Sequence, residues 1–138
     1  MTTSTEYASV RYLVDDVQKA VDFYTDRLGF VLHTNAAPAF ADVVRGSLRL
    51  LLSGPSSSGA RATPAGAAGP GANRIHLVVA DLDTEIEHLR ATDVEFRSEV
   101  VSGPGGRQIL LADPTGNLIE LFQPAAAVGS TPSDRFAR

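Results

Sequence analysis

One carboxylate stands out among the residues that could do chemistry. Residues 107–124 predict a β-hairpin, because two apolar runs flank the turn-forming segment 113–117. Alternation along the second run places Glu120 on the same face as Leu118 and Phe122. A carboxylate on an apolar face needs a cation, a metal, water or a proton as its partner. The remainder of the chain has to supply that partner.

Bulk composition narrows the classes of protein to consider. The chain has 138 residues, which suits a single domain with a real core, and a formal net charge of −4 with a pI of about 5.2. No basic run points to nucleic acid. There is no cysteine, which excludes disulfides and thiolate chemistry. No signal peptide or membrane-length apolar run is seen, so a cytoplasmic protein with no membrane partner is expected.

Periodicity predicts the secondary structure along the chain. Asp15 or Asp16 should cap the first helix and Gly29 should end it, while Asp81 or Asp83 should cap the second. The expected elements, in order, are a strand over 7–14, a helix over 17–28, strands over 30–35, 40–45 and 48–53, a strand over 74–80, a helix over 84–91, and strands over 94–101, 108–112 and 118–122.

A run of Gly, Ala, Pro and Ser separates these elements into two groups. Residues 53–73 carry a single charge, Arg61, and offer no apolar face, so 55–72 is predicted to be a flexible linker or loop. It could be an inert tether or a flap over a ligand. Residues 125–138 are predicted to form a loosely held tail.

The two groups repeat one order of elements, strand–helix–strand–strand–strand. We therefore predict an α+β fold of two tandem βαβββ modules, 7–54 and 73–124. Together they should form a curved, mainly antiparallel sheet with the helices on its outer face. The inner faces would make an open trough, which is a natural pocket.

Two motifs resemble a known family. The first runs from Val14 to Phe30, V-x-D-V-x-x-A-V-D-F-Y-x-x-x-L-G-F, and the second from Asp113 to Leu121, D-P-T-G-N-L-I-E-L. With the duplicated module, they resemble the vicinal oxygen chelate superfamily of glyoxalase I, extradiol dioxygenases, fosfomycin-resistance enzymes and bleomycin-resistance proteins. The resemblance covers about residues 7–124.

The resemblance implies positions for a divalent metal, and the residues there suit one poorly. Glu120 could ligate well, but Arg74 has no lone pair and its charge would oppose the ion. His76 is a fallback second ligand beside Glu120. We therefore predict no metal cofactor, with Arg74, Arg11 or His76 instead making a charge-assisted hydrogen bond to Glu120. The positions that the resemblance implies are Ser9, Leu50, Arg74 and Glu120.

A metal-free trough would bind a small molecule through apolar walls and a few polar groups. His33 could line this cleft or lie at its rim, and His76 could contact the ligand or be an ordinary strand histidine. The predicted ligand-binding residues are Ser9, Arg11, Leu13, His33, Phe40, Leu50, Arg74, His76, Val78, Gln108, Glu120 and Phe122.

The resemblance implies a cytoplasmic binding protein of the metal-free bleomycin-resistance type. Such a protein would confer antibiotic resistance by sequestering a bulky aromatic or apolar natural product in a cleft of a homodimer. An alternative is a glyoxalase-like lyase or isomerase, or a dioxygenase, with a non-standard metal site. A third reading is a metal-free enzyme that uses Glu120 as a general base.

Overall fold

The computed structural model describes residues 7–67, 70–71 and 73–126. The chain groups into two compact units, one of residues up to 74 together with 112–118, the other of residues 75–111 and those from 119 onward. Each unit contains one β-sheet, and the few helices confirm the predicted α+β class.

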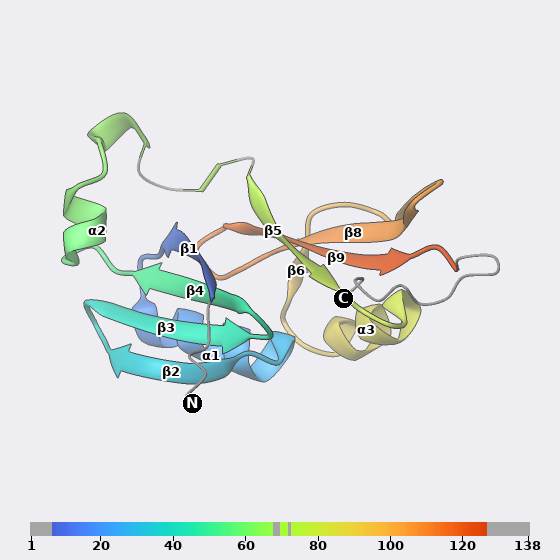
Figure 1. Cartoon of the computed structure of the whole chain (residues 1–138), viewed down its shortest axis with the longest axis horizontal. Helices are drawn as coiled ribbons and strands as arrows, with labels where there is room; N and C mark the ends of the chain where they lie inside the picture. The colour runs from blue at the N-terminus through green and yellow to red at the C-terminus, as the bar shows by residue number, and fades with distance from the viewer. Residues whose placement is uncertain (1–6, 68–69, 72, 127–138) are drawn as a thin grey trace, which may run out of the picture. The chain divides into compact units, whose positions relative to one another are not determined.

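The first unit is a four-stranded sheet with one long helix. Its strand order is β1-β4-β3-β2, with β1 parallel to β4 and the other pairs antiparallel. The helix α1 lies across one face of β2, β3 and β4 (Figure 1). These elements are β1 (Ala8–Leu13), α1 (Val17–Leu28), β2 (Val31–Ala36), β3 (Phe40–Arg45) and β4 (Leu48–Ser53).

The ends of α1 follow from its sequence. The Asp16 side chain accepts a hydrogen bond from the Lys19 backbone N–H at 3.0 Å, which caps the first turn. Gly29 has φ 73° and ends the helix in the left-handed conformation that glycine adopts without strain. The apolar side of α1 is buried at helical spacing, through Val17, Ala20, Val21, Tyr24 and Leu28.

The Ser- and Gly-rich segment that follows β4 contains local structure that composition did not predict. A single helical turn, α2 (Ser58–Arg61), is followed by a 3₁₀ turn, Ala65–Ala67. Ser57 is buried, and its hydroxyl donates to the Gly54 carbonyl at 2.8 Å and accepts from the Ala60 N–H at 3.1 Å. Side-chain hydrogen bonds of this kind order a segment that has no apolar face.

The second unit repeats the strand–helix theme with a broken strand. Its strand order is β5-β9-β8-β6, and β7 also pairs with β8. Its elements are β5 (Arg74–Val78), α3 (Leu82–Arg90), β6 (Glu95–Phe96), β7 (Val101–Gly103), β8 (Gly106–Ala112) and β9 (Leu118–Pro124). Asp81 caps α3 by accepting from the Thr84 N–H at 3.2 Å.

The predicted continuous strand over 94–101 is wrong. The chain pairs with β8 at β6 and again at β7 but leaves the ladder between them. There the Ser98 hydroxyl, instead of a backbone carbonyl, accepts the Leu110 N–H at 3.0 Å. A side chain that substitutes for a backbone group in this way interrupts strand pairing.

The turn between β8 and β9 is organised by one buried carboxylate, that of Asp113. Its Oδ1 accepts three backbone N–H groups, those of Thr115, Gly116 and Asn117, at 2.8–3.0 Å. Its Oδ2 accepts the Tyr24 hydroxyl at 2.8 Å and the Asn117 side-chain amide at 3.0 Å. The second sequence motif therefore specifies a hydrogen-bonded turn, which Asp113 and Asn117 hold together through their side chains.

Candidate ligand-binding site

The face of the first sheet opposite α1 carries several predicted site residues. Ser9 and Arg11 are exposed, and Leu13 and Phe40 are half-buried. Arg11 Nη1 donates to Ser53 Oγ at 2.7 Å, so β4 holds the guanidinium in place. The structure thus confirms that β1 presents Ser9, Arg11 and Leu13 away from the core.

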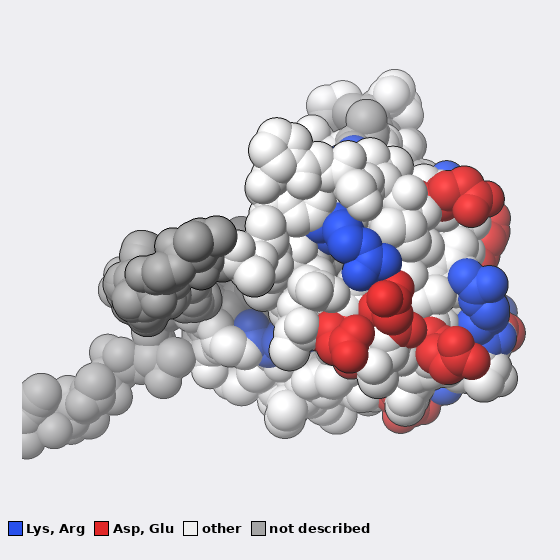
Figure 2. Space-filling model, turned by 90° about the vertical axis from the view of Figure 1, so that its right-hand side faces the viewer, with Lys and Arg blue, Asp and Glu red and all other residues white. Residues whose placement is uncertain are grey.

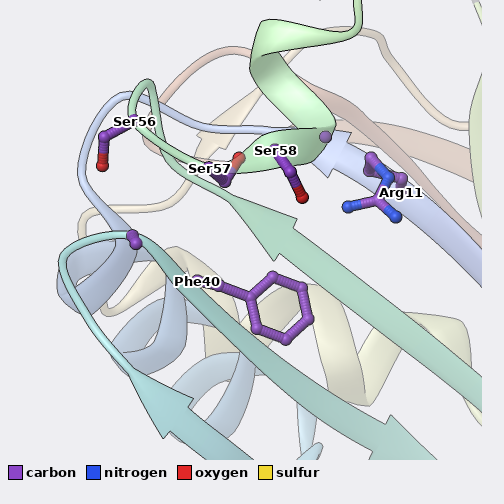
Figure 3. Close-up of a pocket in the computed structure, with 7 residues that line it drawn as sticks. Arg11, Phe40, Ser56, Ser57 and Ser58 are labelled. Atoms are coloured by element: carbon purple, nitrogen blue, oxygen red, sulfur yellow. The ribbon is translucent and has the colours of Figure 1, made fainter.

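A pocket of about 420 Å³ opens beside Arg11 (Figure 3). Its lining combines a cation, an aromatic ring and hydroxyl groups. We call it the Arg11 pocket, lined by Arg11, Ala39, Phe40, Ser56, Ser57, Ser58 and Gly59. Sequence reasoning proposed two of these residues, Arg11 and Phe40. The sequence signal for Ser56, Ser57 and Ser58 was the run of three serines that follows the last strand of the first module.

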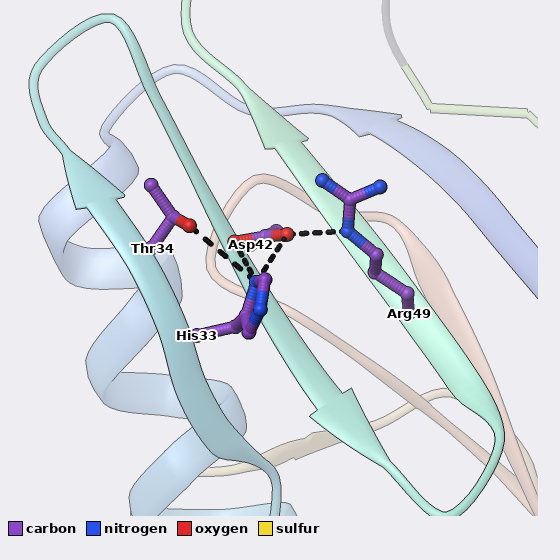
Figure 4. Close-up of polar contacts among 4 residues, drawn as sticks. All are labelled: His33, Thr34, Asp42 and Arg49. Carbon is purple, nitrogen blue, oxygen red and sulfur yellow. Dashed lines mark hydrogen bonds and ion pairs between the residues drawn. The ribbon is translucent and has the colours of Figure 1, made fainter. Parts of the chain in front are cut away.

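A second polar group on the same sheet, the Asp42 cluster, consists of His33, Thr34, Asp42 and Arg49 (Figure 4). Asp42 has no exposed surface. Its carboxylate accepts a hydrogen bond from Arg49 Nε and lies 3.1 Å from His33 Nδ1. Burial acts to raise the pKa of Asp42, but hydrogen bonds from Arg49, His33 and Thr34 outweigh it and hold the pKa below its usual value.

The sequence left open whether His33 lines the cleft or lies at its rim. In the structure its partner is Asp42, on the same sheet. A β-bulge between Leu32 and Thr34 directs its ring toward β3. Sequence reasoning missed Asp42 and Arg49. Strict alternation from Phe40 places Asp42 on the same face, and that parity was the available signal.

The second sheet has its own group, made by His76, Glu120 and Phe122. Glu120 is only 8% exposed, and its Oε2 lies 3.6 Å from His76 Nε2. The rings of His76 and Phe122 pack with centroids 4.9 Å apart. Elsewhere on this sheet Arg74 and Val78 are exposed, and Gln108 is half-buried. Glu120 thus shares its face with a histidine and an aromatic ring, as alternation predicted.

The placement of Leu50 on an open face is wrong. Leu50 is completely buried with Leu52, whereas Leu51 between them is partly exposed. The correct register follows from one hydrogen bond that occurs at the same place in both modules. In the first module Val14 N–H donates to the Ser53 carbonyl, and in the second Val79 N–H donates to the Phe122 carbonyl, both at 2.9 Å. This match pairs Leu51 with Glu120. The sequence superposition was one residue out of register, which exchanges the two faces of a strand.

Residues 7–121 match the family model of the Glyoxalase/Bleomycin resistance protein/Dioxygenase superfamily. The match covers most of the chain and agrees with the paired βαβ-type units, so the protein belongs to this superfamily. No curated protein matches the chain.

Solved structures agree with this assignment. TnmS3, an antibiotic binding protein from Streptomyces sp. CB03234, is 25% identical with a TM-score of 0.68, over 91% of this chain and 100% of its own. A superfamily member from Sphaerobacter thermophilus is 28% identical with a TM-score of 0.68, over 85% and 95% of the two chains. Lactoylglutathione lyase from Agrobacterium tumefaciens is 19% identical with a TM-score of 0.70, over 88% and 96%, and shares the fold.

The donor chemistry does not fit the divalent metal that the resemblance implies. Leu51, which the corrected register matches to Glu120, offers no donor, and Arg74 brings a cation. Within the part of the chain that the structure describes, no three His, Cys, Asp or Glu residues are grouped so as to hold a metal ion. His76 and Glu120 are two donors, whereas a catalytic zinc uses three protein ligands.

The charged surface shows no dominant sign on the face drawn in Figure 2, where acidic and basic side chains are interspersed. Surface ion pairs of the second unit, Arg107 with Asp83 at 2.7 Å and Arg97 with Glu95 at 2.9 Å, are of the kind that adds little stability. Among the helices in the described residues, none has the length and apolar character needed to cross a membrane.

Proposed function

We propose that this protein binds a bulky aromatic or apolar small molecule without metal and acts by sequestering it, as an antibiotic-resistance protein would. The observation that carries the proposal is the Arg11 pocket, which combines an aromatic wall with polar groups. Phe40 is half-buried there, so its ring can stack on a guest. Membership of the superfamily and the likeness to an antibiotic binding protein support the same function.

The chemistry of the site favours binding over catalysis. Arg11 is a permanent cation, and the Asp42 carboxylate is buried and held ionised by Arg49. Neither group is suited to exchange a proton near neutral pH, because general acid–base catalysis needs a pKa close to the working pH. We also propose that the protein is a cytoplasmic homodimer. Light scattering in solution should then measure twice the mass of one chain.

A thermal-shift screen against aromatic natural-product antibiotics tests the function, because a ligand that binds only the native state raises the melting temperature. For any antibiotic that does so, calorimetry should show that Phe40→Leu weakens binding about three- to tenfold, since it removes the stacking surface and keeps an apolar side chain. Phe96→Leu is the matched control, because Phe96 is also half-buried but lies in the second unit.

Two results would contradict the proposal. One is a screen in which no aromatic compound shifts the melting temperature. The other is a bound antibiotic whose affinity is unchanged in Phe40→Leu, which would place it away from the Arg11 pocket.

A further inference from the structure

The Arg11 guanidinium is held by a neutral partner. Its Nη1 donates to Ser53 Oγ at 2.7 Å, and Ser53 has no exposed surface. Among the residues that the structure describes, no carboxylate forms an ion pair with Arg11. A guanidinium has five N–H donors, so most of those of Arg11 are available to a ligand, and its charge is not neutralised.

Arg49, on the neighbouring strand, shows the opposite arrangement. The register pairs Ser9 with Arg49, and Arg11 lies two residues further along β1, so both arginines lie on one face of the sheet. Arg49 donates through Nε to the buried carboxylate of Asp42, which compensates its charge. Among the described residues of this face, Arg11 therefore carries a positive charge that no carboxylate compensates, at the edge of the pocket.

The first residues of α2 hold Arg11 from the other side. A Cβ added at Gly59 would collide with Arg11 Nη1 and Cζ, so the close packing of the guanidinium against α2 depends on glycine at this position. Arg11 is thus fixed between Ser53 and Gly59. A cation whose position is fixed before binding loses little side-chain entropy when a ligand arrives.

The remaining lining supplies hydroxyl donors and an aromatic wall. Ser56 and Ser58 line the pocket, and neither hydroxyl bonds to another described residue. Figure 3 shows the Ser58 hydroxyl and the Arg11 guanidinium directed toward the space that the Phe40 ring bounds. Guanidinium and hydroxyl donors together bind carboxylate or another oxyanion well.

We infer that the Arg11 pocket recognises an acidic ligand, an aromatic body bearing an oxyanion such as a carboxylate. The oxyanion binds Arg11 and the Ser58 hydroxyl, and the aromatic body packs on Phe40. This inference rests on the proposed function and deepens it, because it assigns a charge to the small molecule. The net charge of the chain is −4, so attraction of an anion depends on this local cation.

Two isosteric probes, 2-naphthoate and 2-naphthamide, test the inference by calorimetry or by NMR titration. They share the aromatic body and differ in charge. Wild-type protein should bind the naphthoate about tenfold more tightly than the naphthamide, because only the acid brings a negative charge to the Arg11 guanidinium. The preference should weaken as salt is added.

Two variants test whether Arg11 causes the preference. Arg11→Gln should abolish it, because naphthoate affinity should fall much further than naphthamide affinity. Gly59→Ala keeps the charge but displaces the guanidinium, and it should reduce the preference without loss of helix stability. The matched controls are Arg61→Gln, an exposed arginine of the same segment, and Gly66→Ala, where an added Cβ meets nothing within 4 Å.

The outcomes separate this inference from the proposed function. Equal binding of both probes by wild-type protein, or a naphthoate preference that survives Arg11→Gln, overturns the inference and leaves small-molecule binding intact. Failure of both probes to bind at millimolar concentration counts against the inference and the pocket's binding function together. A preference lost in Arg11→Gln and Gly59→Ala, and kept in both controls, establishes the inference.

Discussion

The two hairpins β3–β4 and β8–β9 occupy matching places in the repeat and are built differently. The first turns through two residues, with Gly46 at φ 60°, and its open face holds the fully buried Asp42 beside Arg49. The second turns through five residues around Asp113, and its open face holds Glu120 beside His76. The repeat therefore preserves backbone pairing and core positions, while turns and open-face side chains diverge. Residues that contact a ligand are therefore expected among the turns and open-face side chains that differ between the two hairpins.

Replacing Asp113 should produce the largest change in stability. Asp113→Ala removes an acceptor of five hydrogen bonds and leaves buried donors unpaired, so the free energy of unfolding should fall by about 3 kcal/mol or more. Urea denaturation followed by circular dichroism measures this loss.

Tyr24→Phe provides the graded control for Asp113. It removes one of the five donors and keeps the ring in the core, so it should cost about 1 kcal/mol. A loss for Asp113→Ala no larger than that of Tyr24→Phe would show that the five-residue turn forms without its carboxylate.

The Asp42 cluster makes a smaller contribution, and that contribution depends on pH. Because the pKa of Asp42 is lowered in the folded protein, its ionised form stabilises the fold fully above the unfolded pKa of about 3.9 and loses this effect as the pH falls through the folded pKa. Asp42→Asn should therefore lower stability by about 2 kcal/mol at pH 7. The difference between wild type and variant should shrink below about pH 4.

Asp26→Asn is the control for this pH dependence, because Asp26 lies exposed on α1. Unfolding in urea at a series of pH values should give similar stabilities for wild type and Asp26→Asn. A difference for Asp42→Asn that is constant down to pH 3 would mean that Arg49 and His33 do not act on the ionised carboxylate.

Parts of the architecture follow from periodicity, because burial alternates along β5 and recurs at helical spacing along α1. Ile75 and Leu77 could be placed in the core from parity alone, and Gly29 could be placed at the end of α1. The candidate site was harder. Leu50 was placed on the wrong face because aligning the two halves by sequence gives no register, and a shift of one residue reverses a strand.

The Arg11 pocket itself depends on a segment with no periodicity. Ser57 orders this segment through its hydroxyl, and Gly59 allows it to touch Arg11, but neither effect produces a hydrophobic pattern. Composition alone indicated a linker there. Side-chain hydrogen bonds between residues distant in sequence, such as that from Arg11 to Ser53, become visible only once the strands are paired.

The smallest expected effect concerns the pair of His76 and Glu120 and sharpens the contrast with Asp42. The separation of 3.6 Å exceeds a normal hydrogen bond, and the His76 side chain is 48% exposed, so water screens the pair. A double-mutant cycle with His76→Gln and Glu120→Gln, measured by urea unfolding at pH 7, should give a coupling energy of no more than about 1 kcal/mol. A coupling energy well above that value would make the pair as structural as Arg49 and Asp42. A small coupling energy means that His76 can turn toward a ligand at little cost to the stability of the fold. Arg49 cannot do the same, because leaving Asp42 would take the arginine partner away from a buried carboxylate.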